Sequence, residues 1–258
     1  MPSHEFNLPR LLVEHRLSAS QLVALDKAQA NYLGNVMRAR AGDSVLLFNG
    51  RDGEWRAEIH ADDPNARRPK LYLIVAEQTR KQPPDDGPEL RYLFAPLKQA
   101  RQDYMVQKAV EMGATAICPV RTDRTQVARV NADRLTSNIR EACEQCGVLS
   151  VPTSEPLAAL TGIPDIANAA ASSAPALVFC DERAPVRDPS HAIAQISQTR
   201  SVSVLVGPEG GFSDGERDML LRLPNAVPIA IGPRILRADT AAVAALAAVQ
   251  MVWGDWRR

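Results

Sequence analysis

The sequence has few cysteines and no long hydrophobic run. Its four cysteines form no disulfide framework, because only Cys143 and Cys146 lie close together, without a second pair of metal ligands. The N-terminus has no basic segment followed by an apolar one, and the longest nearly apolar run, Thr240–Trp253, is too short to cross a bilayer. We therefore expect a soluble, cytoplasmic protein with no metal site.

The sequence also lacks net charge. Thirty basic residues balance thirty acidic ones, so binding to a polyanion must rely on local patches. One such patch is predicted between Arg121 and Arg140, where five arginines stand against two aspartates. Two interpretations are open: the patch contacts the phosphates of RNA, or it is an ordinary solvated helix face with its adjoining loop.

A length of 258 residues suits two domains. Residues 1–78 predict a small, mostly β domain, because short strand-like runs surround the hairpin signals Asn49-Gly50 and Asp52-Gly53. A helix capped by Ser18 or Ser20, with Leu22 and later apolar residues on one face, is expected before these strands. Residues 79–89, rich in proline and charge, predict a linker.

Residues 90–258 alternate short apolar runs with helix-like segments. Strands are predicted at 90–95, 116–120, 177–180, 202–206 and 227–231, and helices at 102–112, 133–146, 213–222 and 240–252. This alternation predicts a mostly parallel α/β sheet with helices on both faces.

Two of the predicted strands end in Gly-Pro. The first loop is Gly207–Gly211, followed by a helix that Ser213 and Glu216 start as a capping box, and the second is Gly232–Arg237. Ligands of open α/β sheets bind beyond the carboxyl ends of the strands, so the two loops are predicted to line one pocket. The alternative is that the glycines only permit tight strand-to-helix turns. Neither loop has the glycine pattern of a dinucleotide or phosphate site.

These loops, with VQKAVEMGA at Val106–Ala114 and EACEQCG at Glu141–Gly147, resemble the RsmE family of 16S ribosomal RNA uridine-N3 methyltransferases, within the SPOUT superfamily. The resemblance extends over the whole chain. It implies a C-terminal SPOUT α/β domain with a deep trefoil knot, an N-terminal PUA-like β-barrel domain and a homodimer. It also implies S-adenosyl-L-methionine as methyl donor, and N3 of a uridine in the 16S rRNA of the small ribosomal subunit as acceptor.

The resemblance further implies which residues form the site. The implied cofactor-binding residues are Leu205, Gly207, Glu209, Gly210, Ile231, Gly232, Leu236, Arg237 and Ala238. Arg237 is the candidate catalytic residue, because a guanidinium can stabilise the negative charge on O2 and O4 of uracil when N3 loses its proton. The alternative is that Arg237 pairs with Asp239 or Glu209 and only braces the loop. The proton acceptor is left unassigned.

Arginines are also the candidates for RNA binding. They are Arg10, Arg38, Arg121, Arg124 and Arg234, with Arg40, Arg67 and Arg68 adding charge to the N-terminal domain. The chain departs from the family pattern at Ala238-Asp239, where Thr-Glu is usual, and at Val148, where an arginine is usual and a cationic RNA contact is therefore missing. Two rival functions stay open: a SPOUT ribose 2′-O-methyltransferase and a non-catalytic RNA-binding assembly factor.

Overall fold

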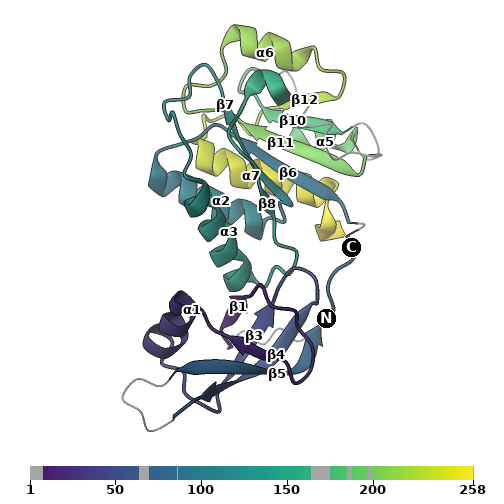
Figure 1. Ribbon diagram of the computed structural model, residues 1–258. Coiled ribbons are helices and arrows are strands. Elements are labelled where there is room, and N and C mark those ends of the chain that lie inside the picture. The colour runs from purple at the N-terminus through teal and green to yellow at the C-terminus, as the bar shows by residue number, and fades with distance from the viewer. Residues whose placement is uncertain are drawn as a thin grey trace. The chain divides into compact units, whose positions relative to one another are not determined.

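The computed structural model describes residues 8–63, 70–85, 87–163, 175–184, 188–196 and 199–257 (Figure 1). The chain forms two units, residues 1–84 with 143–151 and residues 85–142 with 152–258. Both ends of the expected linker lie in strands, because β5 extends to Arg80 and β6 begins at Glu89. No helix among the described residues is long and apolar enough to span a membrane.

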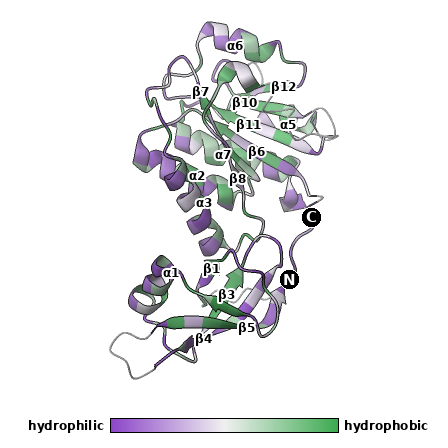
Figure 2. Ribbon diagram, in the orientation of Figure 1, coloured by the Kyte–Doolittle hydropathy of each residue, from purple (hydrophilic) through white to green (hydrophobic). Residues whose placement is uncertain are grey.

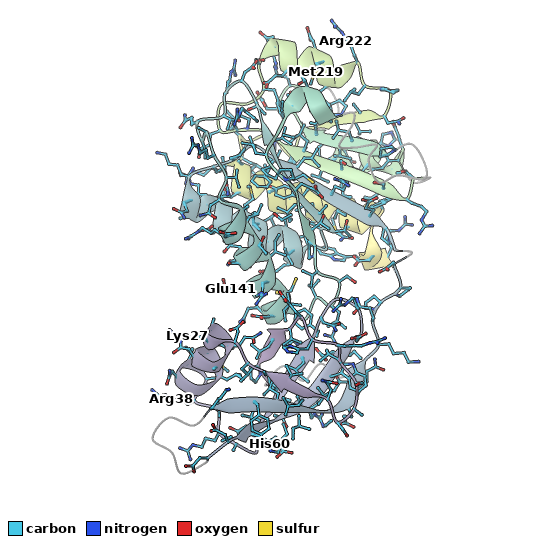
Figure 3. All side chains as sticks on the ribbon, viewed as in Figure 1. Lys27, Arg38, His60, Glu141, Met219 and Arg222 are labelled. Atoms are coloured by element: carbon cyan, nitrogen blue, oxygen red, sulfur yellow. The ribbon has the colours of Figure 1, made fainter. Side chains whose placement is uncertain are left out.

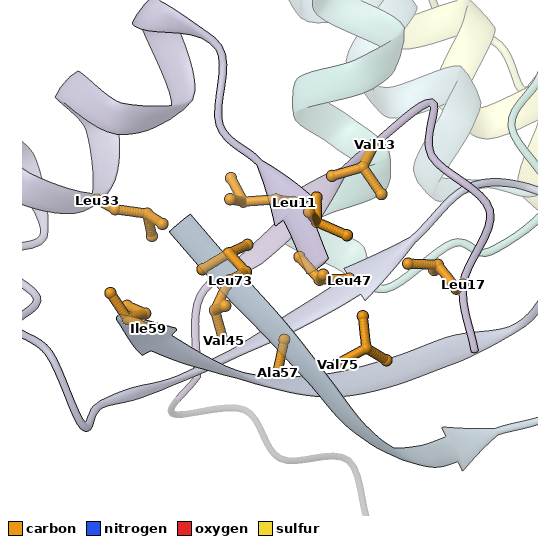
Figure 4. Packing of buried hydrophobic residues seen from close by; sticks show 11 residues of the cluster. Leu11, Val13, Leu17, Leu33, Val45, Leu47, Ala57, Ile59, Leu73 and Val75 are labelled. Carbon is orange, nitrogen blue, oxygen red and sulfur yellow. The ribbon is translucent and has the colours of Figure 1, made fainter. Parts of the chain in front are cut away.

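The first unit is built on a five-stranded sheet of order β1-β3-β4-β5-β2. Its strands are β1 (Arg10–Leu12), β2 (Leu22–Ala24), β3 (Ser44–Phe48), β4 (Glu54–Ala61) and β5 (Leu71–Arg80). All its pairs are antiparallel except β1 with β3. This half-barrel surrounds one aliphatic cluster, in which Val45, Ile59 and Leu73 are fully buried (Figure 4).

The helix expected behind Ser18 or Ser20 is wrong in its position. Residues 22–24 instead form β2, where Val23 is buried and both of its neighbours are exposed. A two-residue alternation of this kind is what a strand imposes on its side chains. The apolar residues whose spacing suggested one helix therefore belong to two elements, the short strand β2 and the helix that follows it.

The helix begins at a capping box that lies further along the chain. The Asp26 side chain accepts a hydrogen bond from the backbone N–H of Gln29 at 2.8 Å, and the Gln29 side chain accepts one from the Asp26 N–H at 3.1 Å. Helix α1 (Lys27–Asn31) then continues into the π-helix η1 (Tyr32–Val36). Soon after η1, Arg38 adopts a left-handed φ of 56°, which is uncommon for a residue with a Cβ.

Arg10, Glu54 and Arg80 form a buried ionic cluster in the first unit. The Glu54 carboxylate accepts hydrogen bonds from Arg10 Nε at 3.0 Å and from Arg80 Nε and Nη2 at 2.9 and 2.7 Å. Arg80 Nη2 also donates to Gly147 O at 3.0 Å, so the segment 143–151 is anchored at this cluster. Burial raises the pKa of Glu54, but the hydrogen bonds outweigh burial and hold this pKa below its ordinary value.

The second unit is built on a seven-stranded sheet of order β12-β10-β11-β6-β7-β8, with β9 paired to β7. Every pair is parallel, as predicted. The strands are β6 (Glu89–Phe94), β7 (Ala116–Arg121), β8 (Thr153–Ser154), β9 (Ala158–Ala159), β10 (Ala176–Cys180), β11 (Ser201–Val206) and β12 (Ala226–Ile229).

Helices cover both faces of this sheet, as predicted. On one face, Leu220 of α6 packs on a buried cluster that includes Leu93 and Phe179. On the other face, α7 contacts β11 and packs against α2 and α5, and Figure 2 shows the hydrophobic strands between these layers. The helices are α2 (Gln99–Glu111), α3 (Ala132–Cys146), α5 (Pro189–Ala194), α6 (Asp214–Leu221) and α7 (Ala238–Val252), with the 3-10 turns η2 (Leu160–Gly162) and η3 (Asp255–Arg257).

We expect Glu54→Gln to destabilise the first unit by about 3 kcal/mol, because the buried Arg10 and the half-buried Arg80 lose the carboxylate that both of them bond. Hydrogen exchange of the β4 and β5 amides measures this local stability. A carboxyl with a depressed folded pKa stabilises the fold above its unfolded pKa, near 4.5, and loses that contribution as the pH falls through the folded value. The exposed Glu77→Gln is the control, and equal protection in both variants would contradict the account.

Candidate functional site

The two Gly-Pro loops leave the same edge of the sheet, on either side of β10 (Figure 1). Cys180, the last residue of β10, pairs with Ile229 of β12. The pairing of Phe179 with Leu205 places Val206, the end of β11, on the other side of Cys180. Neighbouring strands are about 4.8 Å apart, so the loops begin on the order of 10 Å from each other. This spacing allows both loops to contact one small ligand.

The first loop, residues 207–212, is a tight turn over the end of β11. The Gly211 N–H donates to Pro208 O at 2.8 Å. A Cβ on Gly207 would lie only 3.0 Å from the Phe212 ring, which is buried in the core beneath the loop. Glycine at this position therefore permits the ring to close under the turn.

In the structure the second loop spans residues 230–237, because β12 already ends at Ile229, and its backbone groups are open over residues 231–236. Among the described residues, no N–H or C=O group from Ile231 to Leu236 forms a hydrogen bond. Gly232 has a φ of 70°, and a Cβ there would meet nothing within 4 Å. Such a loop can recognise the polar edge of a ligand such as a purine base through its backbone.

An ion pair joins the first loop to the neighbouring helix. Glu209, in the turn, pairs with Arg101 of α2. Because α2 follows β6, which pairs with β11, the bridge links two adjacent strand ends. Both side chains are about half exposed, so the pair adds less than about 1 kcal/mol to stability and acts chiefly on the orientation of the loop. No local sequence pattern marks Arg101, since only the sheet pairing brings it to Glu209.

The predicted cofactor-binding residues lie at this edge of the sheet but differ in exposure. Glu209, Gly210, Gly232 and Arg237 are exposed, Gly207, Ile231 and Leu236 are half-buried, and Leu205 and Ala238 are buried. The Leu205 side chain belongs to the core cluster with Phe212. The exposed and half-buried residues are therefore the ones whose side chains or backbone a ligand can reach.

Arg237 is the N-cap residue of α7 and is exposed. Within the described parts of the chain its side chain has no hydrogen bond or ion pair. The two acids considered as partners are engaged elsewhere, Glu209 with Arg101 and Asp239 Oδ1 with the Thr240 N–H at 2.8 Å. The bracing alternative for Arg237 is therefore not observed, and the guanidinium is available to a ligand.

The predicted RNA-binding arginines of the first unit have different environments. Arg10 is only 7% exposed and bonded to Glu54, so in this structure its side chain supports the fold of the first unit, and its role in RNA binding stays a prediction. Arg38 is exposed (Figure 3). Its neighbours in sequence, Val36 and Met37, are exposed as well. Arg40 is exposed as well, and Arg67 and Arg68 lie outside the described residues.

The three candidates of the second unit are all exposed. Arg124 Nη1 donates to Gly210 O at 2.6 Å, so this arginine contacts the first loop directly. Arg121 Nη2 donates to Ala128 O at 3.0 Å, within the loop that follows β7. Arg234 lies in the second loop. Arg234 is therefore part of the second Gly-Pro loop, and Arg124 is in contact with the first.

Comparison with known proteins decides the family. A family model described as an RNA methyltransferase domain matches residues 85–250, and one described as an RNA methyltransferase PUA domain matches residues 25–66. Ribosomal RNA small subunit methyltransferase E of Rickettsia conorii is 30% identical over 244 residues, covering 94% of this chain and 95% of that protein. The chain belongs to the ribosomal RNA small subunit methyltransferase E family. The α/β methyltransferase domain and the N-terminal PUA domain that the resemblance implied are confirmed.

Solved structures resemble this methyltransferase along most of its length. Ribosomal RNA small subunit methyltransferase E of Neisseria gonorrhoeae, bound to S-adenosyl methionine, superposes with a TM-score of 0.77 at 25% identity, covering 96% of this chain and 99% of that chain. A putative methyltransferase of Legionella pneumophila, in complex with the same cofactor, gives a TM-score of 0.74 at 26% identity and covers 96% and 99% of the two chains.

We expect Arg101→Glu to weaken binding of S-adenosylmethionine about tenfold, because two carboxylates then repel each other at the first loop. The reversed pair, Arg101→Glu with Glu209→Arg, should restore the affinity to within about threefold of the original. Calorimetric titration measures both constants. Arg222→Glu, an exposed charge reversal at the end of α6, is the matched control. A double variant as weak as the single one would show that the ion pair does not position the loop.

Proposed function

We propose that this methyltransferase transfers a methyl group from S-adenosyl-L-methionine to N3 of a uridine in the 16S rRNA of the small ribosomal subunit. The main support is the second loop, whose backbone groups and Arg237 guanidinium have no hydrogen-bond partner among the described residues. This loop begins one strand away from the first loop, at the same edge of the sheet. The cofactor seen in two similar structures and the name of the Rickettsia relative agree with this proposal. A ribosomal substrate implies that the protein acts in the cytoplasm.

The two loops fit the proposed cofactor by their chemistry. When bound, S-adenosylmethionine supplies an electrophilic methyl group on a positively charged sulfur. The N–H and C=O groups of residues 231–236, which have no partner in the described part of the chain, can bind the polar edge of its adenine, while Ile231 and Leu236 offer half-buried apolar contact. Gly207 and Gly210 let the first loop approach the ligand without side-chain bulk.

Arg237 is proposed to act on the uracil ring. Removal of the N3 proton leaves negative charge on O2 and O4, and a guanidinium can hold such oxygens by charge-assisted hydrogen bonds. Arg237 has no competing partner among the described residues, so it does not have to break an ion pair before it binds the base. Arg234, exposed in the same loop, is proposed to hold a phosphate or a uracil oxygen.

The wider assembly is also a proposal. The resemblance supports a homodimer and a deep trefoil knot in the C-terminal domain. For the RNA surface we propose Arg38, with its exposed apolar neighbours, together with Arg121 and Arg124 beside the first loop. Binding through these arginines would weaken with salt, since each phosphate contact releases counterions.

We expect Arg237→Ala to lower kcat by a factor of about 100 to 1,000, because the negative charge on the base loses its stabilising donor. The affinity for S-adenosylhomocysteine should change less than threefold. The assay is tritium transfer from labelled cofactor to small subunits that lack the methyl group, followed by nucleoside analysis. The expected product is 3-methyluridine.

Arg222→Ala removes an exposed arginine at the end of α6 and is the matched control for this assay (Figure 3). Turnover that survives in Arg237→Ala would exclude the proposed role of this guanidinium. A ribose-methylated product would favour the 2′-O-methyltransferase instead, and cofactor-independent RNA binding without product would favour an assembly factor.

Arg38→Gly tests the RNA surface of the first unit with two opposed effects. Glycine adopts a left-handed φ without strain, so the first unit should be equally stable or more stable by about 1 kcal/mol. Affinity for small subunits should nevertheless fall several-fold, and the salt dependence of binding should decrease by about one phosphate contact. An unchanged salt dependence would remove Arg38 from the interface.

A further inference from the structure

A cavity of about 730 Å³ lies in the second unit, at the carboxyl end of β7. Its walls are the loop 121–128, residues 159–161 and the first two turns of α6. No residue of either Gly-Pro loop lines it. In the sheet, β7 is separated from β11 by β6, on the side away from β12. The cavity is therefore distinct from the proposed cofactor pocket but neighbours its first loop.

Three hydrogen bonds connect one wall of this cavity to the first Gly-Pro loop and to α6. Arg124 donates to Gly210 O at 2.6 Å, and Ser213 Oγ donates to Asp123 Oδ2 at 2.6 Å. The Asp123 N–H donates to Glu216 Oε1 at 2.7 Å. These bonds hold the loop 121–128 against the first Gly-Pro loop, which we assign to cofactor binding. An occupant of the cavity would lie next to the site of methyl transfer.

Three arginines lie on or beside the loop that bounds the cavity, and two acids line it. Its two acids are both engaged, since Asp123 accepts from Ser213 Oγ and Glu216 accepts from the N–H groups of Asp123 and Ser213. Arg121 lines the cavity and is exposed, as are its loop neighbours Arg124 and Arg129. Exposed guanidinium groups on this loop can contact the phosphates of a nucleic acid.

The lining itself combines apolar surface with one open amide. Leu160, Met219 and Val127 provide the apolar part (Figure 3 labels Met219). The Thr125 hydroxyl is bonded to Thr122, whereas the Gln126 side chain is exposed and has no partner among the described residues. A nucleobase has apolar faces and a polar edge, and unpaired RNA bases are recognised by stacking and by hydrogen bonds to that edge.

We propose that this cavity holds one unpaired base of the RNA substrate, next to but not identical with the target uridine. Its flanking phosphates then lie on Arg121 and Arg124, and the Gln126 amide contacts the edge of the base. The target uridine itself must reach Arg237, which does not line the cavity. This inference rests on the proposed function and names a determinant of its substrate choice. A peptide as occupant is the less favoured alternative, because both acids of the lining are already engaged.

Gly215 offers a way to fill the cavity without disturbing the backbone. It lines the cavity, and a Cβ built on it meets nothing within 4 Å. The probes are fluorescein-labelled, uridine-centred heptaribonucleotides with each of the four bases at the flanking positions, and small subunits lacking the methyl group. We expect the unaltered protein to prefer one base at one flanking position about tenfold.

Gly215→Trp should remove this preference, weaken RNA binding about tenfold, and raise KM for the small subunit with little change in kcat. Gln126→Ala should reduce the preference while leaving the cavity open. Leu221→Trp places the same side chain at an exposed position of α6 that does not line the cavity, and it should retain both affinity and preference. Affinity for S-adenosylhomocysteine should be unchanged in all three variants.

Folded Gly215→Trp with unaltered affinity and base preference would overturn the proposal, as would an unaltered protein that shows no preference at any flanking position. Either result would leave the peptide alternative. Absence of methyl transfer by the unaltered protein would instead contradict the proposed function, and the heptaribonucleotide measurements distinguish that failure from a failure of the cavity proposal.

Discussion

Parallel pairing of β10 with both β11 and β12 determines where the two Gly-Pro loops emerge. Residues near the ends of β11 and β12 flank Cys180, so both turns begin at one level of the sheet and one strand apart. A parallel sheet directs the carboxyl ends of all its strands to the same edge, which is why residues more than twenty positions apart in sequence can form one site. The proposed cofactor and base sites both depend on this edge.

The two loops differ in a way that suits different tasks. The first is closed by its own hydrogen bond, by the Phe212 ring beneath it and by contacts from Arg101 and Arg124. The second has six residues whose backbone groups form no hydrogen bond within the described ranges, and it ends at Arg237, which has no partner there either. The first loop can therefore hold a ligand in place, and the second can supply the backbone groups that bind it by hydrogen bonds.

Local patterns predicted much of this fold. Alternating apolar runs located the strands and main helices of the second unit, and the Ser213 and Glu216 capping box forms as expected. The first helix was misplaced because β2 has only three residues, too few for a strand alternation to stand out from helical spacing. The burial of Arg10 could not be read from its neighbours in sequence, since its partner Glu54 lies 44 positions away.

In the candidate site too, local sequence patterns predicted some features, whereas others depend on contacts between residues far apart in the sequence. Glycine and proline marked both loops, because such turns need particular backbone geometry. The Arg101–Glu209 pair and the cavity beside β7 depend on which strands are neighbours, and no local pattern encodes that order. Strand order became known only with the structure.

The most direct test of the account is hydrogen exchange of the whole protein with and without S-adenosylhomocysteine. Backbone groups that bind a ligand become protected from solvent, so we expect new protection across residues 231–237 and 207–212. Residues 121–128, which line the separate cavity, should exchange at an unchanged rate. Saturating ligand that leaves 231–237 unprotected, or protects 121–128 instead, would contradict the claim that the two Gly-Pro loops hold the methyl donor.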